Sequence, residues 1–109
     1  MVTNKMKEEF LKFKLASDIN WAKRALICIF AFQTQEEKKY KSTKTINNVG
    51  FTAFDAELLT SFAQQLNSKG NLSEAQEKVL RSKMPKYWKQ VERISDQDIL
   101  EKLIISTLN

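Results

Sequence analysis

Residues 19–33, INWAKRALICIFAFQ, carry the strongest signal for the fold, because Lys23 and Arg24 are the only charged positions among them. On a helix, the apolar side chains of this stretch would occupy nearly every side, and they cannot all face one neighbour. A helix that is apolar all round is a buried helix. We therefore predict that residues 19–33 form a central helix, which other elements contact from several directions.

The composition around this stretch favours helices over strands. The chain has 109 residues with two glycines and one proline, and these are the residue types that hairpins and tight turns use. With 42% hydrophobic residues and seven phenylalanines, the chain can bury a core. We predict an all-α fold, a compact bundle of five or so helices around the central apolar helix, in a single domain over residues 1–109.

Capping patterns predict where the helices begin. A Ser or Thr followed three residues later by an acidic residue or glutamine can satisfy the free N–H groups of a first turn. The chain has four such pairs: Thr34 and Glu37, Thr52 and Asp55, Ser73 and Gln76, and Ser95 and Asp98. The first would open a short polar helix ending near Tyr40, before a loop at residues 42–50. A further helix is expected from Lys5, and Ser17 or Asp18 would cap the central helix.

The spacing of apolar residues predicts which sides of these helices face the core. The expected inward residues are Met6, Phe10 and Phe13, with Leu11 as a further candidate, then Phe54, Leu58, Leu59, Phe62 and Leu66, then Leu72, Ala75, Val79, Leu80, Met84, Val91 and Ile94, and finally Ile99, Leu100, Leu103, Ile104 and Leu108. Gly70 is expected to end the helix that follows Thr52. The apolar stripe continues past Pro85, which predicts either a kinked helix or a new helix with Pro85 in its first turn.

The side chains that most catalytic sites need are scarce. The chain has no histidine and one cysteine, which removes the commonest general base and any thiolate metal cluster. Gly50 and Gly70 form no phosphate-binding loop. Asp55 has a sufficient structural role as the capping partner of Thr52, and Cys28 is expected to be a small buried hydrophobe. We expect a protein that is not an enzyme and that uses no cofactor or metal.

Neither a secretion signal nor a membrane span is visible in the chain. Residues 1–14 alternate charged and apolar side chains, unlike a signal peptide. The longest apolar run, residues 25–32, is too short to cross a bilayer. We expect a cytoplasmic protein with no membrane partner, in the host cytoplasm if a phage encodes it.

Positive charge is the one feature that suggests a binding function. The net charge is +5, and between Lys38 and Arg93 eleven basic residues stand against five acidic ones. After Ser73, basic residues recur at helical spacing opposite the apolar stripe, where they could neutralise successive phosphates. The alternative is a solvated helix face interrupted by Glu77 and Glu92. The candidate nucleic-acid-binding residues are Lys38, Lys39, Lys41, Lys44, Phe51, Lys78, Arg81, Lys86, Tyr87, Lys89 and Arg93.

Aromatic residues near these cations have two possible roles. Tyr87 and Trp88, beside Lys86 and Lys89, could stack on bases, or they could pack in the core. Their place in the apolar stripe favours core packing for at least one of this pair, and Phe51 has the same two possible roles.

Four short blocks of sequence also carry a resemblance. The blocks are Gln33-Thr34-x-x-Glu37, Asn48-Val49-Gly50-Phe51-x-x-x-Asp55-Ala56, Leu72-Ser73-x-x-Gln76 and Lys86-Tyr87-x-x-Gln90. In this order they resemble a group of small helical proteins and domains of phages and bacterial mobile elements, sometimes found beside or fused to helicase-like proteins. The resemblance extends from Trp21 to about Val91, with Asn48 in place of a glycine. It implies a context of nucleic-acid transactions and supplies no mechanism.

Two functions fit these observations. The first is a non-enzymatic accessory nucleic-acid-binding protein of a phage or mobile element, which contacts phosphates through a basic helix face. The second is a modulator or inhibitor of a host or phage enzyme, such as a helicase or a CRISPR effector, whose acidic protein surface would meet the lysines. An enzyme with an unrecognised site is a third, less supported reading. A homodimer through apolar surface left on the terminal helix is compatible with all three.

Overall fold

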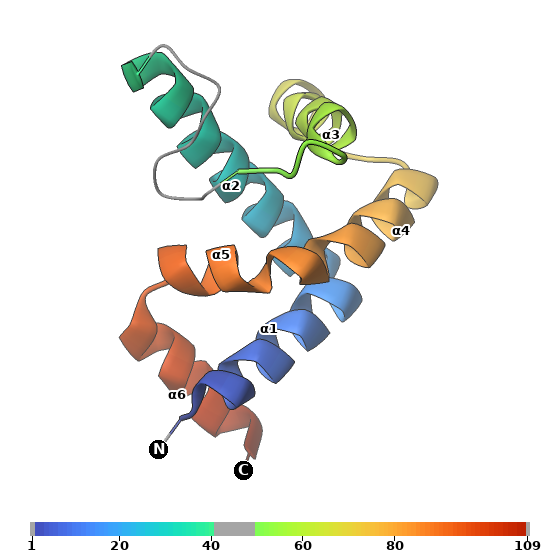
Figure 1. Ribbon diagram of the computed structural model, residues 1–109. Helices are drawn as coiled ribbons and strands as arrows, with labels where there is room; N and C mark the ends of the chain where they lie inside the picture. Colours follow the sequence, from blue (N-terminus) through green and yellow to red (C-terminus); the bar gives the residue numbers. More distant parts are fainter. Residues whose placement is uncertain (1, 41–49, 109) are drawn as a thin grey trace.

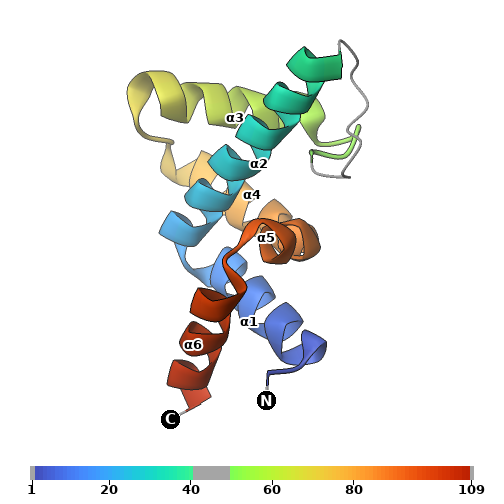
Figure 2. The ribbon, with the colours of Figure 1, turned by 90° about the vertical axis from the view of Figure 1, so that its left-hand side faces the viewer.

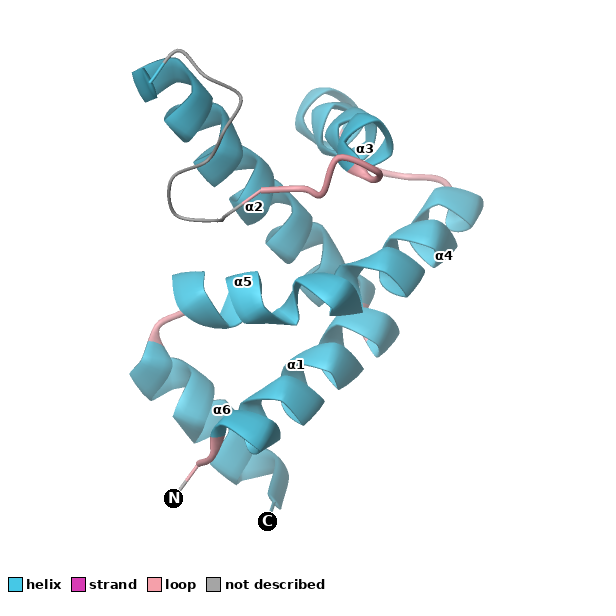
Figure 3. Ribbon diagram, viewed as in Figure 1, coloured by secondary structure: helices cyan, strands magenta, loops and turns pink. Residues whose placement is uncertain are grey.

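The computed structural model describes residues 2–40 and 50–108, without the side chains of residues 35–40. The regular elements in this part of the chain are all helices. Figure 3 shows this helical architecture. The elements are α1 (Asn4–Ser17), α2 (Ile19–Tyr40), α3 (Ala56–Lys69), α4 (Glu74–Lys83), the 3₁₀ helix η1 (Met84–Tyr87), α5 (Trp88–Ile94) and α6 (Gln97–Leu108). The all-α prediction is confirmed. None of these described helices combines the length and apolarity needed to cross a membrane.

Helices α1 and α2 form the centre of the bundle. Leu11 and Leu15 of α1, like Leu26 and Ile29 of α2, are fully buried. Helix α2 contacts α1, α3, α4, η1 and α5, as expected of the central helix, and α1 contacts α2, α4, η1, α5 and α6. The core therefore lies where these two helices meet the α4–η1–α5 segment.

The remaining helices are arranged around this centre in a simple order (Figures 1 and 2). Helix α3 lies at one end of the molecule and α6 at the other in both views. Between them, α4, η1 and α5 follow one another as a bent rod across the middle of the molecule. We call this segment, residues 74–94, the basic rod, and it is the segment that carries most of the described candidate site residues.

Three of the expected helix boundaries are confirmed. Ser73 Oγ accepts from the Gln76 N–H at 3.1 Å, and the Gln76 side chain accepts from the Ser73 N–H at 2.8 Å, so the capping box of α4 is complete. Gly70 ends α3 in the left-handed conformation, with φ of 81°. Of the two candidates before α2, Asp18 is the cap, because its Oδ1 accepts from the Asn20 N–H at 3.0 Å.

Two other expected boundaries are wrong. Thr34 does not start a helix, since α2 continues to Tyr40 and the Thr34 hydroxyl donates to the Phe30 carbonyl at 2.8 Å. A threonine inside a helix satisfies its hydroxyl in this way. At α6 the cap is Asp96, whose Oδ1 accepts from the Ile99 N–H at 3.1 Å, while Ser95 donates back to Val91. The loop predicted at residues 42–50 lies outside the described residues except for Gly50.

Pro85 lies in the first turn of η1, which separates α4 from α5. The apolar stripe nevertheless continues across it, because Leu80, Met84, Tyr87 and Val91 are all buried. A 3₁₀ turn tolerates the missing N–H of proline at its start. This arrangement combines the two alternatives that the sequence left open, a new helical turn at Pro85 and a continued inward stripe.

Several residues expected in the core are exposed instead. On α1, Leu11 and Leu15 occupy the core and Phe13 is turned outward, and on α6 the buried pair is Leu100 and Ile104. The predicted inward residues found exposed are Phe13, Phe54, Leu58, Ala75, Val79, Ile99, Leu103 and Leu108. Cys28, expected to be buried, is also exposed, because the buried side of α2 is the one formed by Ala22, Leu26 and Ile29.

Candidate functional site

Side-chain amides hold the backbone just before α3. The Gln90 side chain accepts from the Gly50 N–H at 2.8 Å and donates to the Gly50 carbonyl at 3.0 Å. Gln33 of α2 accepts from the Phe51 N–H at 2.8 Å. Each of these peptide groups would otherwise lack a regular helical partner. Residues 50 and 51 are therefore fixed between α2 and α5.

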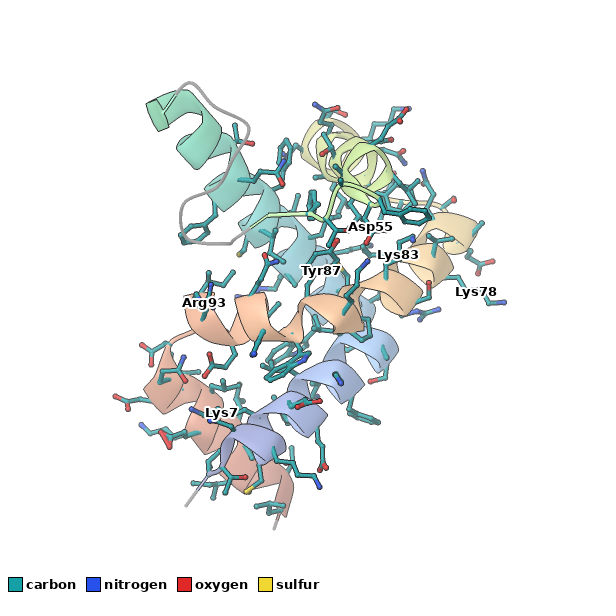
Figure 4. All side chains as sticks on the ribbon, in the orientation of Figure 1. Lys7, Asp55, Lys78, Lys83, Tyr87 and Arg93 are labelled. Atoms are coloured by element: carbon teal, nitrogen blue, oxygen red, sulfur yellow. The ribbon has the colours of Figure 1, made fainter. Side chains whose placement is uncertain are left out.

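A buried carboxylate holds the next residues of this segment. The Asp55 side chain is 0% exposed and lies 3.0 Å from the Lys83 ammonium through Oδ1. Its Oδ2 accepts from the Tyr87 hydroxyl at 2.8 Å and pairs with Lys86. The Tyr87 oxygen in turn accepts from the Thr52 N–H at 3.1 Å. Figure 4 shows Asp55, Lys83 and Tyr87 pointing toward one another between α3 and the basic rod.

The charges of this cluster stabilise one another. Burial by itself raises the pKa of Asp55, but hydrogen bonds from Lys86, Lys83 and Tyr87 outweigh it and hold the pKa well below its usual range. The hydrogen bond with Asp55 raises the pKa of Lys86. Burial, together with donation to Asp55, raises the pKa of Tyr87. The cluster therefore contains an ionised carboxylate and two ammonium groups, and its net charge is positive.

The capping role expected for Asp55 is wrong. Thr52 Oγ1 lies 3.4 Å from Asp55 Oδ2, so the two residues do meet, but the Asp55 side chain makes no capping hydrogen bond to α3. An ionised carboxylate taken out of water needs opposite charges. The sequence shows that Lys83, Lys86 and Tyr87 are spaced three and four residues apart and share one side of a helix, but this spacing does not identify Asp55 as their partner.

Three of the four quoted sequence blocks meet in this network. Gln33, Gly50, Phe51, Asp55, Lys86, Tyr87 and Gln90 all belong to it. The remaining block, Leu72-Ser73-x-x-Gln76, completes the cap of α4. Its Gln76 exchanges two side-chain hydrogen bonds of 2.9 Å with Gln65 of α3. The blocks thus share a structural task, which is to fix α3 and the segment before it onto the rest of the bundle.

Comparison with known proteins adds no relative to this description. No family model matches the chain, and no curated protein or solved structure matches it either. The function is therefore argued from the geometry of the chain itself.

The described basic candidates lie along the basic rod. Lys78 and Lys89 are exposed, Arg81 is partly exposed, and Arg93 is exposed at the far end of α5. In Figure 4, Lys78 projects away from the body of the molecule near one end of the rod, and Arg93 lies near the other end. Lys86 is half exposed although it pairs with Asp55. Five of the expected basic residues thus remain accessible on one continuous segment.

The acidic residues expected to interrupt this face are paired with other helices. Glu77 Oε2 lies 2.9 Å from the Lys23 ammonium of α2. Glu92 Oε1 lies 3.7 Å from the Lys7 ammonium of α1. Both glutamate side chains are about three-quarters buried. The two interruptions are therefore neutralised within the bundle.

The aromatic candidates pack inside the structure. Tyr87 is 2% exposed, and Phe51 is partly buried with its ring edge-on to that of Tyr87 at a centroid distance of 6.0 Å. These contacts support core packing for both Phe51 and Tyr87. Because the Tyr87 ring is buried, it has no free face on which a base could stack. Lys38 and Lys39 belong to α2, but their side chains are outside the described part, and Lys41 and Lys44 lie outside the described residues altogether.

A second surface feature lies between α2 and α6. A groove of about 300 Å³ is lined mainly by apolar side chains, with Arg24 and Asp96 among the polar ones. Its apolar lining includes Trp21, Ala25, Ile94, Ile99 and Leu103, together with Cys28. In the part of the chain that the structure describes, no group of acidic or cysteine side chains is suited to hold a metal ion.

Proposed function

We propose that the protein is a non-enzymatic nucleic-acid-binding protein that contacts phosphates through the exposed cations of the basic rod. The observation that carries this proposal is the pairing of Glu77 with Lys23 and of Glu92 with Lys7. These pairs neutralise two of the three acidic side chains of the basic rod, and the third, Glu74, is exposed at the start of α4. The predicted binding cations of the basic rod that are exposed or partly exposed are Lys78, Arg81, Lys86, Lys89 and Arg93.

The buried cluster adds to this positive field. Lys83 and Lys86 share one carboxylate, that of Asp55, so the three groups together carry a charge of about +1 at neutral pH. Lys86 is 49% exposed and keeps N–H donors that can face a phosphate. The middle of the basic rod is therefore positive, although its lysines are already paired.

The length of the rod suits a run of phosphates. From Lys78 to Arg93 the helical rise gives roughly 20–25 Å, whereas phosphates of one DNA strand follow one another at about 3.4 Å along the axis. Binding of this kind gains affinity by counterion release and therefore weakens steeply with salt. Contacts to phosphate alone carry no base sequence, so we propose binding without sequence specificity through this face.

Fluorescence anisotropy with labelled single-stranded and duplex DNA and RNA tests the proposal. We expect binding at low salt and a linear fall of log K with log salt concentration. The double variant Lys78→Glu, Lys89→Glu should bind more weakly and lower the slope by about 2 for duplex DNA. The matched control is Lys69→Glu, Lys102→Glu, which changes the net charge equally at exposed positions on α3 and α6.

The two double variants distinguish an effect of the net charge on binding from an effect of the cations on the basic rod. If both double variants weaken binding equally, net charge and not the basic rod would be responsible. If the wild-type chain binds none of the four nucleic acids at low salt, the proposal is wrong.

Binding to a protein is the second candidate, and the α2–α6 groove is the observation that favours it. Its apolar lining includes Ile99 and Leu103 of α6, which are both exposed, and exposed apolar surface of this kind often marks a protein contact. Here the partner would place an apolar segment in the groove, and an acidic patch could face the lysines. A complex recovered from a host lysate after nuclease treatment, and lost on Leu103→Glu, would support this function over the first.

A further inference from the structure

Phe54 is a large aromatic side chain held in water. It is 88% exposed, more than any other large apolar residue in the described part of the chain. Leu58, near the start of α3, is also exposed. Leaving an aromatic ring in solvent forgoes the free energy of burying it. A ligand that covers the ring would gain this free energy.

The backbone that carries Phe54 is fixed on both sides. The Asp55 N–H donates to the Thr52 carbonyl at 3.0 Å, which closes a turn around Phe54. The Thr52 N–H is bound by the Tyr87 hydroxyl, and the Asp55 carboxylate is buried among its three partners. The backbone at Phe54 therefore needs no ordering when a ligand binds, which favours affinity.

Cations adjoin this ring. The Lys83 ammonium lies 5.4 Å from the centroid of the Phe54 ring, and Lys86 pairs with the neighbouring Asp55. An exposed aromatic face beside ammonium groups is the combination with which proteins bind single strands, since a base stacks on the ring and its phosphate meets the cation. Paired bases inside a duplex cannot offer a free face in this way.

We infer that Phe54, with Lys83 and Lys86, forms a stacking site for one unpaired base, so that the protein prefers single-stranded nucleic acid over duplex. This inference rests on the proposed function and deepens it, because the basic rod supplies the phosphate contacts on either side. It also replaces the stacking role that was expected of Phe51 and Tyr87, both of which pack inside the structure.

A comparison of Phe54→Ala with Phe13→Ala tests the inference. Phe13 is a matched control, since it is also well exposed but lies on α1. With labelled oligothymidylate, we expect Phe54→Ala to weaken binding roughly tenfold, and Phe13→Ala to have no effect. Neither variant should change the affinity for the same sequence paired with its complement, and circular dichroism should show that both variants keep the helical content of the wild-type chain.

A tryptophan at the same position provides an independent readout. Phe54→Trp should keep the affinity for oligothymidylate, and its added emission, measured against the wild-type Trp21 and Trp88 background, should be quenched by the single strand and not by the duplex. The inference is overturned if Phe54→Ala binds oligothymidylate as tightly as wild type. If that happens while Lys78→Glu, Lys89→Glu still weakens binding, the stacking site fails and the proposed function stands; if wild type binds no nucleic acid, both fail.

Discussion

The Tyr87 hydroxyl donates a hydrogen bond of 2.8 Å to Oδ2 of Asp55, across 32 positions of the chain. The same oxygen accepts from the Thr52 N–H, so one side chain of η1 binds both ends of the turn that precedes α3. Because Tyr87 and Asp55 are buried, water cannot easily replace either contact. The position of α3 relative to the basic rod therefore depends on this phenol.

Tyr87→Phe removes the hydroxyl and keeps the ring. It leaves a buried carboxylate oxygen and a peptide N–H without this partner, so we expect the free energy of unfolding to fall by about 1–3 kcal/mol. Urea denaturation followed by circular dichroism measures this change. In the background of Asp55→Asn the same substitution should cost less, because the hydrogen bond to an ionised oxygen is already gone. Equal costs in both backgrounds would mean that the two side chains do not interact.

Asp55 should also make the free energy of unfolding fall as the pH becomes acidic. Its pKa in the folded chain lies below the ordinary value of 3.8, so its contribution to stability is present above about pH 4 and is lost as the pH falls below that value. Wild type should therefore lose more stability between about pH 4 and pH 2 than Asp55→Asn does. Urea unfolding midpoints over this range provide the measurement. The exposed substitution Asp98→Asn is the control, and a pH slope unchanged by Asp55→Asn would contradict the assignment.

Lys83 and Lys86 share the task of compensating Asp55. With Lys83→Met or Lys86→Met alone, one ammonium group still faces the carboxylate, and the lost partner is partly solvent-exposed. Each single change should therefore cost under about 1 kcal/mol. The double change leaves a buried carboxylate with only Tyr87 and Thr52 nearby, and about 3 kcal/mol is expected. Chemical denaturation of the four proteins tests this non-additivity, and a double variant that costs no more than the sum of the singles would refute it.

Some local signals were predictable from the sequence. The cap of α4 by Ser73 and Gln76, and the end of α3 at Gly70, both depend on residues within one helical turn. The same reasoning failed for Asp55. Its partners Lys83 and Tyr87 lie 28 and 32 positions away, and the nearby Thr52 offered a simpler explanation. A pattern within four residues cannot show that a carboxylate is buried by the tertiary fold.

Periodicity failed in a comparable way at the ends of helices. Phe54 fits the spacing of Leu58 and Phe62, but α3 begins only at Ala56, so Phe54 is not on the helical face that the spacing assumes. In α6 the spacing correctly identified an apolar side, yet only Leu100 and Ile104 meet the core. The sequence shows that a helix is amphipathic, whereas the width of the buried stripe depends on how many neighbours the helix has.

Cys28 reports on the α2–α6 groove. Its thiol is exposed and lines the groove together with Ile99 and Leu103, so a small disulfide reagent should modify it in the folded protein without denaturant. A reaction that proceeds only after unfolding would contradict the described geometry.

The same reaction tests whether the chain forms the homodimer that the apolar surface of α6 would permit, because a second copy seated on that surface would cover the thiol. If the dimer forms, the thiol of Cys28 should be modified more slowly as the protein concentration rises, and light scattering should show a mass that rises over the same range. The variant Ile99→Glu should then restore both the fast reaction of the thiol and the monomer mass. A monomer mass at two concentrations, with the same rate of modification at both, would rule out the dimer and leave the groove open to another protein.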